Sequence, residues 1–256
     1  LFRSLQPVDW SSGWPVIGNA GEPYWKFRKP KSDSKTIVNP VETDEFDSSK
    51  LGMQWQWQND YKESYGQATS MGFFRLFTYA LPELGDVSNL WYVPNMLLQK
   101  TPADEFTATT KLSFCSRNSD QYVGLVCMSA EYSSVGLQRT EDGYELQIRH
   151  NPNAMRTHLT DEVLTVDTLK PTQKGTPRKG RPAEMHIKDV YLRMSIKDSK
   201  VNYAYSIDGK KWKKAGGEYA MGKGRWIGSK IGFFAVDPNK TGRKGFIDID
   251  WFRISR

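Results

Sequence analysis

The chain has 256 residues, of which 13% are aromatic and 25% are charged, and its formal net charge at pH 7 is +7. This length is enough to bury a sizeable core in one large domain, or in one domain plus a fragment. No apolar run approaches the roughly 18 residues of a membrane span, and the basic residues are dispersed except in the loop-like stretch 170–181. Because no nucleic-acid-binding signature accompanies that stretch, we expect neither a membrane nor a nucleic acid as a partner.

Residues 1–40 do not have the pattern of a self-contained domain. Two short apolar stretches, LQPV and GWPVIG, predict strands separated by a Ser-Gly turn, and residues 26–40 are charged and interrupted by proline, as in a linker. Two strands cannot bury Trp10 and Trp14 on their own, so we expect this segment to pack against something else. Since the sequence begins with Leu1 rather than Met, we also expect a longer parent chain.

The pattern of the chain changes at residue 44. Alternation in residues 51–58 (LGMQWQWQ) predicts a strand that carries Trp55 and Trp57 on one face and glutamines on the other. The pair Asp142-Gly143 predicts a turn between two later strands. Strands are predicted at 89–100, 106–114, 122–128, 135–139 and 144–148, and one more at 163–166 inside a long loop.

The clearest hairpin signal is VNYAYSIDGKKW, at residues 201–212. Tyr203 and Tyr205 alternate with small or polar residues up to Asp208-Gly209, a pair favoured in two-residue turns that need a positive φ. Further strands are predicted at 190–196, 226–236 and 246–254. No segment of about ten residues or more has a helical apolar stripe, so we predict an all-β, antiparallel jelly-roll-like sandwich.

The two cysteines, Cys115 and Cys127, lie in predicted strands on either side of a turn at residues 117–120. The centre of that turn does not place them opposite each other, so we predict buried thiols rather than a disulfide. Neither cysteine has a spacing that is typical of a metal site.

Several of these motifs resemble glycoside hydrolases of family 43. "LQPVxW…GWPVIG" resembles the segment that closes the five-bladed catalytic propeller of that family. "S-x-DG-x-x-W" and the final "DWFR" resemble the C-terminal sandwich of the family, and "PNMLLQK-x-PA-x-x-FTATTKL" resembles the branch of that sandwich found on its larger, hemicellulose-degrading members. The resemblance covers nearly the whole chain and is weakest at residues 154–182. It implies that residues 1–40 are a propeller-closing segment and linker, and that residues 41–256 are a concanavalin A-like accessory sandwich.

The resemblance also implies a function. The parent enzyme would be a β-xylosidase or α-L-arabinofuranosidase, for which a periplasmic or extracellular location is favoured. The partners of this chain would be the catalytic propeller of the same protein and a hemicellulose oligosaccharide. The family's catalytic carboxylates would lie upstream of Leu1, so the present chain would be inactive alone.

Two carboxylates near the C-terminus are the first candidates for chemistry. Asp248 and Asp250 share a strand face at about 6.6–6.8 Å, a separation that would permit an inverting pair of glycosidase carboxyl groups. Neither has an obvious partner that would raise its pKa. We therefore predict no catalytic residue in this chain, and regard these aspartates as exposed or structural.

A cation site and a sugar contact are the other candidates. Related lectin-like sandwiches often bind Ca²⁺ between their first and last strands, which makes Asp44 and Asp250 candidate ligands, with solvated carboxylates as the alternative. The resemblance places Trp226, in GKGRWIG, on a loop that helps to wall the active-site pocket. A core position is the alternative for this ring.

A different class of function also stays open. An autonomous carbohydrate-binding module would use exposed tryptophans as a sugar platform, with Trp55, Trp57, Trp91 and Trp212 as the candidates. Core packing is the competing role for these rings, because aromatic side chains dominate core burial. A free-standing hydrolase that uses the C-terminal aspartate pair is a third alternative.

Overall fold

The structure is a computed structural model that describes residues 5–19, 21–28, 31, 39–81, 89–155, 160–224, 227–239 and 242–256. The chain divides into two compact units, Leu1–Asn39 and Pro40–Arg256. In the first unit, β1 (Val8–Asp9) pairs antiparallel with β2 (Val16–Ile17), in the two stretches where the sequence predicts strands. Gly13 has a φ of 77° and its amide donates to the carbonyl of Trp10, which forms the turn between them. The identity of this unit as a propeller-closing segment stays a prediction.

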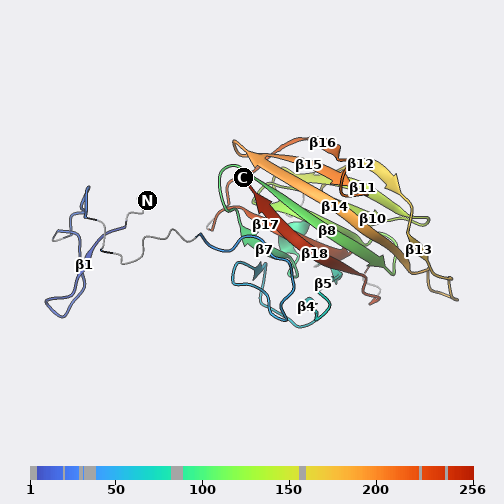
Figure 1. Cartoon of the computed structure of the whole chain (residues 1–256), viewed down its shortest axis with the longest axis horizontal. Coiled ribbons are helices and arrows are strands. Elements are labelled where there is room, and N and C mark those ends of the chain that lie inside the picture. The colour runs from blue at the N-terminus through green and yellow to red at the C-terminus, as the bar shows by residue number, and fades with distance from the viewer. Residues whose placement is uncertain are drawn as a thin grey trace. The chain divides into compact units, whose positions relative to one another are not determined.

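The second unit consists of two packed β-sheets (Figure 1). The β9 sheet contains β3 (Gln56–Trp57), β6 (Tyr79–Ala80), β7 (Leu97–Lys100), β9 (Tyr122–Met128), β10 (Tyr132–Arg139), β11 (Tyr144–Asn151), β12 (Glu162–Leu169) and β17 (Lys230–Asp237). The β8 sheet contains β4 (Gly66–Ala68), β5 (Phe74–Phe77), β8 (Phe106–Ser116), β13 (Gln173–Lys174), β14 (Met185–Lys197), β15 (Lys200–Ser206), β16 (Lys213–Ala220) and β18 (Phe246–Ser255).

Strand order defines a sandwich. The β9 sheet runs β12-β11-β10-β9-β17-β7-β3, with β6 beside β17, and the β8 sheet runs β16-β15-β14-β8-β18-β5-β4, with β13 beside β14. The pairings are antiparallel except for the short parallel contact of β6 with β17. Two antiparallel sheets packed face to face are the predicted concanavalin A-like architecture, and the prediction of an all-β fold is confirmed. No helix in the described ranges is long and apolar enough to cross a membrane.

The main core lies between the two sheets. Strand β8 contributes Leu112 and Phe114 to it, and β9 contributes Leu125 from the opposite side. A second core lies on the other face of the β9 sheet, where Leu90 and Phe234 are among its members. Because both faces of that sheet are covered, every residue of β9 and β17 is buried, in contrast to the alternating burial of β8.

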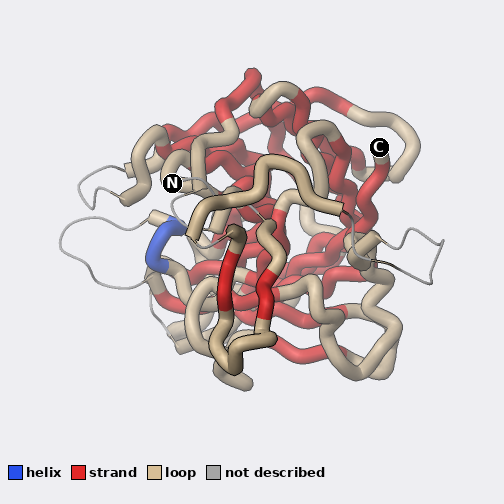
Figure 2. Tube along the Cα trace, turned by 90° about the vertical axis from the view of Figure 1, so that its left-hand side faces the viewer, coloured by secondary structure: helices blue, strands red, loops and turns tan. Residues whose placement is uncertain are grey.

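Two predicted elements differ in detail from the structure. Residues 89–100 are not one strand, since the 3₁₀ turn η1 (Leu90–Tyr92), blue in Figure 2, precedes β7. Asn89 caps this turn by accepting a hydrogen bond from the backbone of Trp91. The predicted two-residue turn at Asp208-Gly209 is instead a connection over residues 207–212. Gly209 does have a positive φ, of 69°, and Asp208 shapes the loop by accepting hydrogen bonds from the two backbone amides after Gly209.

The four candidate platform tryptophans do not share a surface. Trp55 is 8% exposed and packs in the main core, and Trp57 is half-buried against that core. Trp91 packs against the second core, whereas Trp212 lies against the guanidinium of Arg193, 3.6 Å from its ring centroid. The burial of Trp55 and the separate packing of the other three rings favour the core alternative over a shared sugar platform.

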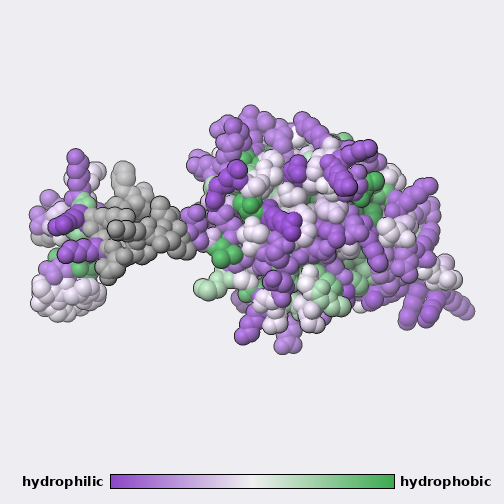
Figure 3. All heavy atoms as spheres, viewed as in Figure 1, coloured by the Kyte–Doolittle hydropathy of each residue, from purple (hydrophilic) through white to green (hydrophobic). Residues whose placement is uncertain are grey.

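The prediction of two buried thiols is confirmed, since Cys115 and Cys127 are both buried and free. Figure 3 shows that the side of the sandwich over β14, β8 and β18 is mainly hydrophilic, with small separate hydrophobic patches.

Candidate functional site

A pocket of about 360 Å³ lies at one end of the β9 sheet. Its lining comes from the end of β9, the start of β17, the residue after β3, the turn η1 and the glycine-rich loop 222–228. Lys230 and Met128 are cross-strand partners, which brings the ends of β17 and β9 together at this place. The described lining residues are Gln58, Trp91, Met128, Ser129, Gly224, Ile227, Gly228 and Lys230.

A buried cation is the main electrostatic feature of the pocket. Lys230 is 8% exposed, and burial lowers the pKa of its ammonium group. Its Nζ donates to Oε1 of Gln58 at 2.7 Å, and the Gln58 side chain in turn donates to the carbonyl of Trp91 at 3.4 Å. Because an ammonium group has three donors, Lys230 retains capacity for an additional acceptor such as a hydroxyl.

The glycine-rich loop closes one side of the pocket. A side chain at Gly224 would place its Cβ 1.9 Å from the carbonyl carbon of Gly228, so the loop can fold back on itself only with glycine there. Gly228 has a φ of 81°, and Ser229 Oγ donates to the carbonyl of Gly222 at 2.8 Å, which ties the two ends of the loop together. Trp226, the predicted sugar contact, lies outside the described residues, but both neighbouring parts of its loop line the pocket.

The side chains that line the pocket are suited to binding a ligand. An indole, an amide and an ammonium group meet in one concave site, which is a common composition for pockets that hold polar ligands with apolar faces. Among the described lining residues there is no carboxylate, histidine or cysteine. The pocket residues that the structure describes could therefore orient a ligand, but they offer no pair of carboxyl groups for glycoside hydrolysis.

The C-terminal aspartates are paired with cations. Asp248 accepts two hydrogen bonds from Arg75, at 2.7 and 2.8 Å, and Asp250 forms an ion pair with Lys111 at 2.6 Å. The hydrogen bonds of Lys111 to Asp250 and Asp189 raise its pKa. Both C-terminal aspartates line one depression on the outer face of the β8 sheet, as expected for a shared strand face, but each carboxylate is held by a neighbouring cation.

Asp44 lies where the first segment of the sandwich meets its last strand. Its backbone pairs with Phe252 of β18. Its Oδ2 accepts hydrogen bonds from the Trp55 indole at 2.7 Å and from the Gln54 amide at 3.2 Å, and its Oδ1 accepts one from the backbone of Phe46. The segment that precedes β3 thus meets the last strand, β18, and a calcium ion shared by Asp44 and Asp250 would have to compete with protein donors at each carboxylate. The calcium site stays a prediction.

This calcium prediction can be tested by thermal melting. An ion that binds the folded chain and not the unfolded chain raises the melting temperature, so a chelator should lower it. Asp250→Ala should remove that sensitivity to chelator. An unchanged melting curve in chelator, together with elemental analysis that finds no calcium in the purified chain, would contradict the prediction.

The sheet order defines the fold class of the protein, and its similarity to known sequences defines the family. Two sheets with this order form a concanavalin A-like sandwich, and residues 43–255 match the family described as "Beta xylosidase C-terminal Concanavalin A-like domain" of glycoside hydrolase family 43. The chain belongs to this family.

The relatives are longer proteins. A β-xylosidase of Formosa agariphila is 27% identical over 274 residues, covering 98% of this chain and 42% of that protein. A non-reducing end α-L-arabinofuranosidase of Bacteroides ovatus is 23% identical, covering 79% of this chain and 34% of that protein. The solved structure of a GH43 protein of Bacillus licheniformis matches with a TM-score of 0.67 and 25% identity, covering 97% of this chain and 46% of that one. The chain therefore spans less than half the length of these relatives.

Proposed function

We propose that this chain is the accessory sandwich of a family 43 enzyme that acts on xylose- or arabinose-containing hemicellulose. In this role the sandwich supports the catalytic propeller, and the pocket beside the loop 222–228 forms part of the wall around the substrate. The observation that carries the proposal is the pocket itself, which combines Trp91, Gln58 and the buried Lys230 without a carboxylate in its described lining.

The exposed tryptophans of the first unit favour the presence of a partner domain. Trp10 is 64% exposed, Trp14 is 73% exposed and Trp25 is 95% exposed. Large apolar side chains gathered in so short a segment are typical of surfaces that another protein surface covers. A propeller of the same parent protein would supply such a surface, which agrees with the resemblance of residues 1–40 to a propeller-closing segment.

The proposal can be tested by kinetics in the full-length enzyme. Trp91→Ala, Lys230→Met and Trp226→Ala should each lower kcat/KM for short xylo-oligosaccharides, by about 10–100-fold where the change misplaces the substrate. Because none of these side chains would transfer a proton, the pH profile of kcat should keep its shape.

Trp212→Ala is the matched control, since this tryptophan lies against Arg193 and outside the pocket lining. It should leave kcat/KM at the wild-type value. Equal kinetics in wild type, control and the Trp91, Lys230 and Trp226 variants would refute a role of these residues in substrate positioning. Support of the propeller would then be the remaining proposed role of the sandwich.

A further inference from the structure

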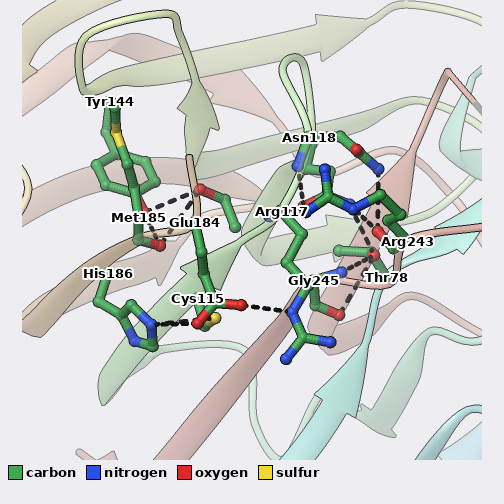
Figure 4. A network of polar contacts seen from close by, with 12 residues as sticks. Thr78, Cys115, Arg117, Asn118, Tyr144, Glu184, Met185, His186, Arg243 and Gly245 are labelled. Atoms are coloured by element: carbon green, nitrogen blue, oxygen red, sulfur yellow. Dashed lines mark hydrogen bonds and ion pairs between the residues drawn. The ribbon is translucent and has the colours of Figure 1, made fainter. Parts of the chain in front are cut away.

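Three side chains that could bind a metal ion lie together outside the pocket, and the proposed function gives them no role. Cys115, Glu184 and His186 each present one potential ligand atom, and these atoms lie within 4.8 Å of one another. In the part of the chain that the structure describes, this is the one such group of three. Figure 4 shows the three side chains close together near the end of β8, with Arg117 beside them.

The pairing of β8 with β14 produces the cluster. His186 is the cross-strand partner of Cys115. Residues two apart on an extended chain share a face, so Glu184 lies on the face of His186, and Arg117 lies on that of Cys115. Four polar side chains therefore form a square on the outer face of the β8 sheet, while Met185 between the two β14-side residues points into the core.

The distances within the cluster are close to those around a tetrahedral ion. Sγ of Cys115 lies 3.5 Å from Nε2 of His186, and this nitrogen lies 2.9 Å from Oε1 of Glu184. Zinc bonds of about 2.3 Å to sulfur and about 2.0 Å to nitrogen, at a tetrahedral angle, place the two atoms about 3.5 Å apart. The corresponding nitrogen-to-oxygen edge is about 3.3 Å, so the carboxylate would move back by about 0.4 Å.

The fourth side chain of the square orients the carboxylate. Nε of Arg117 donates to Oε2 of Glu184 at 2.7 Å, whereas Oε1 of the same carboxylate is directed to His186. Residues that hold a metal-binding carboxylate by its other oxygen are a common feature of protein metal sites. Contacts from both strands therefore already hold the carboxylate beside His186, and only a small movement is needed to admit an ion.

The cluster is also accessible. Cys115 is only 2% exposed, but Cys115 and His186 both line the depression of about 280 Å³ on this face of the sheet. The side chains of His186 and Glu184 are 28% and 40% exposed. The depression gives an ion a path to the sulfur and leaves space for a water molecule as an additional ligand.

We propose that Cys115, Glu184 and His186 bind a zinc ion, with water as the fourth ligand. Thiolate and imidazole ligands favour zinc over calcium or magnesium, which prefer oxygen ligands alone. As the sulfur-to-zinc bond forms, the thiol releases its proton to solvent, and no atom changes oxidation state. The ion links the end of β8 to the start of β14, and this site is separate from the pocket beside loop 222–228.

Cobalt(II) is a suitable spectroscopic probe for the purified, reduced, metal-free chain. A thiolate bound to cobalt gives a charge-transfer absorption in the near ultraviolet, which oxygen and nitrogen ligands alone do not give. We expect this band to saturate at one equivalent of cobalt and to disappear when zinc is added. Zinc should also raise the melting temperature, because it binds the folded chain.

Variants of the ligands complete the test. Cys115→Ser should lose the band, and His186→Gln and Glu184→Gln should weaken cobalt binding at least about 10–100-fold, the range seen even for residues that only support a ligand. Cys127→Ser is the matched control, because Cys127 is a buried free thiol on β9 outside the cluster, and it should retain the band.

Either of two results would overturn the proposal. One is a wild-type chain that develops no charge-transfer band with excess cobalt. The other is a band that persists in Cys115→Ser or that is lost in Cys127→Ser. If Cys115→Ser does not fold, His186→Gln provides the same test, since this partly exposed side chain lies outside the core and its replacement should weaken binding without unfolding the chain.

Discussion

Trp55→Ala is expected to lower the free energy of unfolding by about 3–5 kcal/mol, as large-to-small changes in a packed core do. The indole stacks on Phe46 at a centroid distance of 5.6 Å and meets Phe233 and Phe252 at 5.9 and 5.3 Å. Its removal would also deprive the Asp44 carboxylate of its shortest hydrogen bond, from the indole nitrogen at 2.7 Å. Urea denaturation of the wild type and the variant measures this difference.

Trp212→Ala is the control for this experiment as well. Its indole contacts Arg193 on the outer face, and a half-buried cation–π contact of this kind contributes about 0.5–2 kcal/mol, less than a core tryptophan. We therefore expect a small loss of stability for Trp212→Ala and a large one for Trp55→Ala. A Trp55→Ala protein with wild-type stability would show that this tryptophan is not a core residue.

Trp55→Ala also tests the alternative that the chain is an autonomous carbohydrate-binding module. Titration calorimetry of the wild-type chain with arabinoxylan oligosaccharides should give no saturable heat if these tryptophans serve the core. Saturable binding that is lost in a stable Trp55→Ala protein would instead favour the module. The buried position of Trp55 is the physical reason for our expectation, because a ring that is 8% exposed offers little area for stacking on a sugar.

The long strands of the main core could be predicted closely from the sequence. The prediction at 122–128 coincides with β9, and those at 106–114 and 246–254 fall within β8 and β18. These segments combine β-branched and aromatic residues with turn signals at their ends, and in β8 and the first half of β18 buried positions alternate with half-buried ones. Local pattern and tertiary burial therefore point to the same structure.

Shorter elements were harder to predict because their local pattern is ambiguous. Strand β5 was not predicted, since its sequence FRLF has apolar residues on both faces, with Phe74 buried and Phe77 half-buried. The turn η1 has a strand-like apolar composition, and its conformation is set by the cap at Asn89 and by burial of Leu90 in the second core. That core forms only when the sandwich is assembled, so no local window reveals it.

The Cys115–Glu184–His186 cluster and the Lys230 pocket could not be predicted either, because each joins residues that are far apart in the sequence. Cys115 and His186 are 71 residues apart, so no ligand spacing along the sequence indicates their contact. Lys230 and Gln58 are 172 residues apart, and Lys230 reads as one more dispersed surface cation until burial is known. The resemblance to family 43 identified the loop around Trp226, but the buried Lys230 could be recognised only after β9 and β17 were paired.

We propose that this sandwich assists a glycoside hydrolase without performing hydrolysis itself, and the activity of the purified chain is the most direct test of this proposal. Asp248 and Asp250, its best sequence candidates for a carboxyl pair, are each held in an ion pair, by Arg75 and Lys111 respectively, and are not directed together at one free site. We predict that the 256-residue chain does not accelerate the hydrolysis of aryl xylosides or aryl arabinofuranosides above the rate in buffer. Measurable turnover that is abolished by Asp248→Asn or Asp250→Asn would contradict this account.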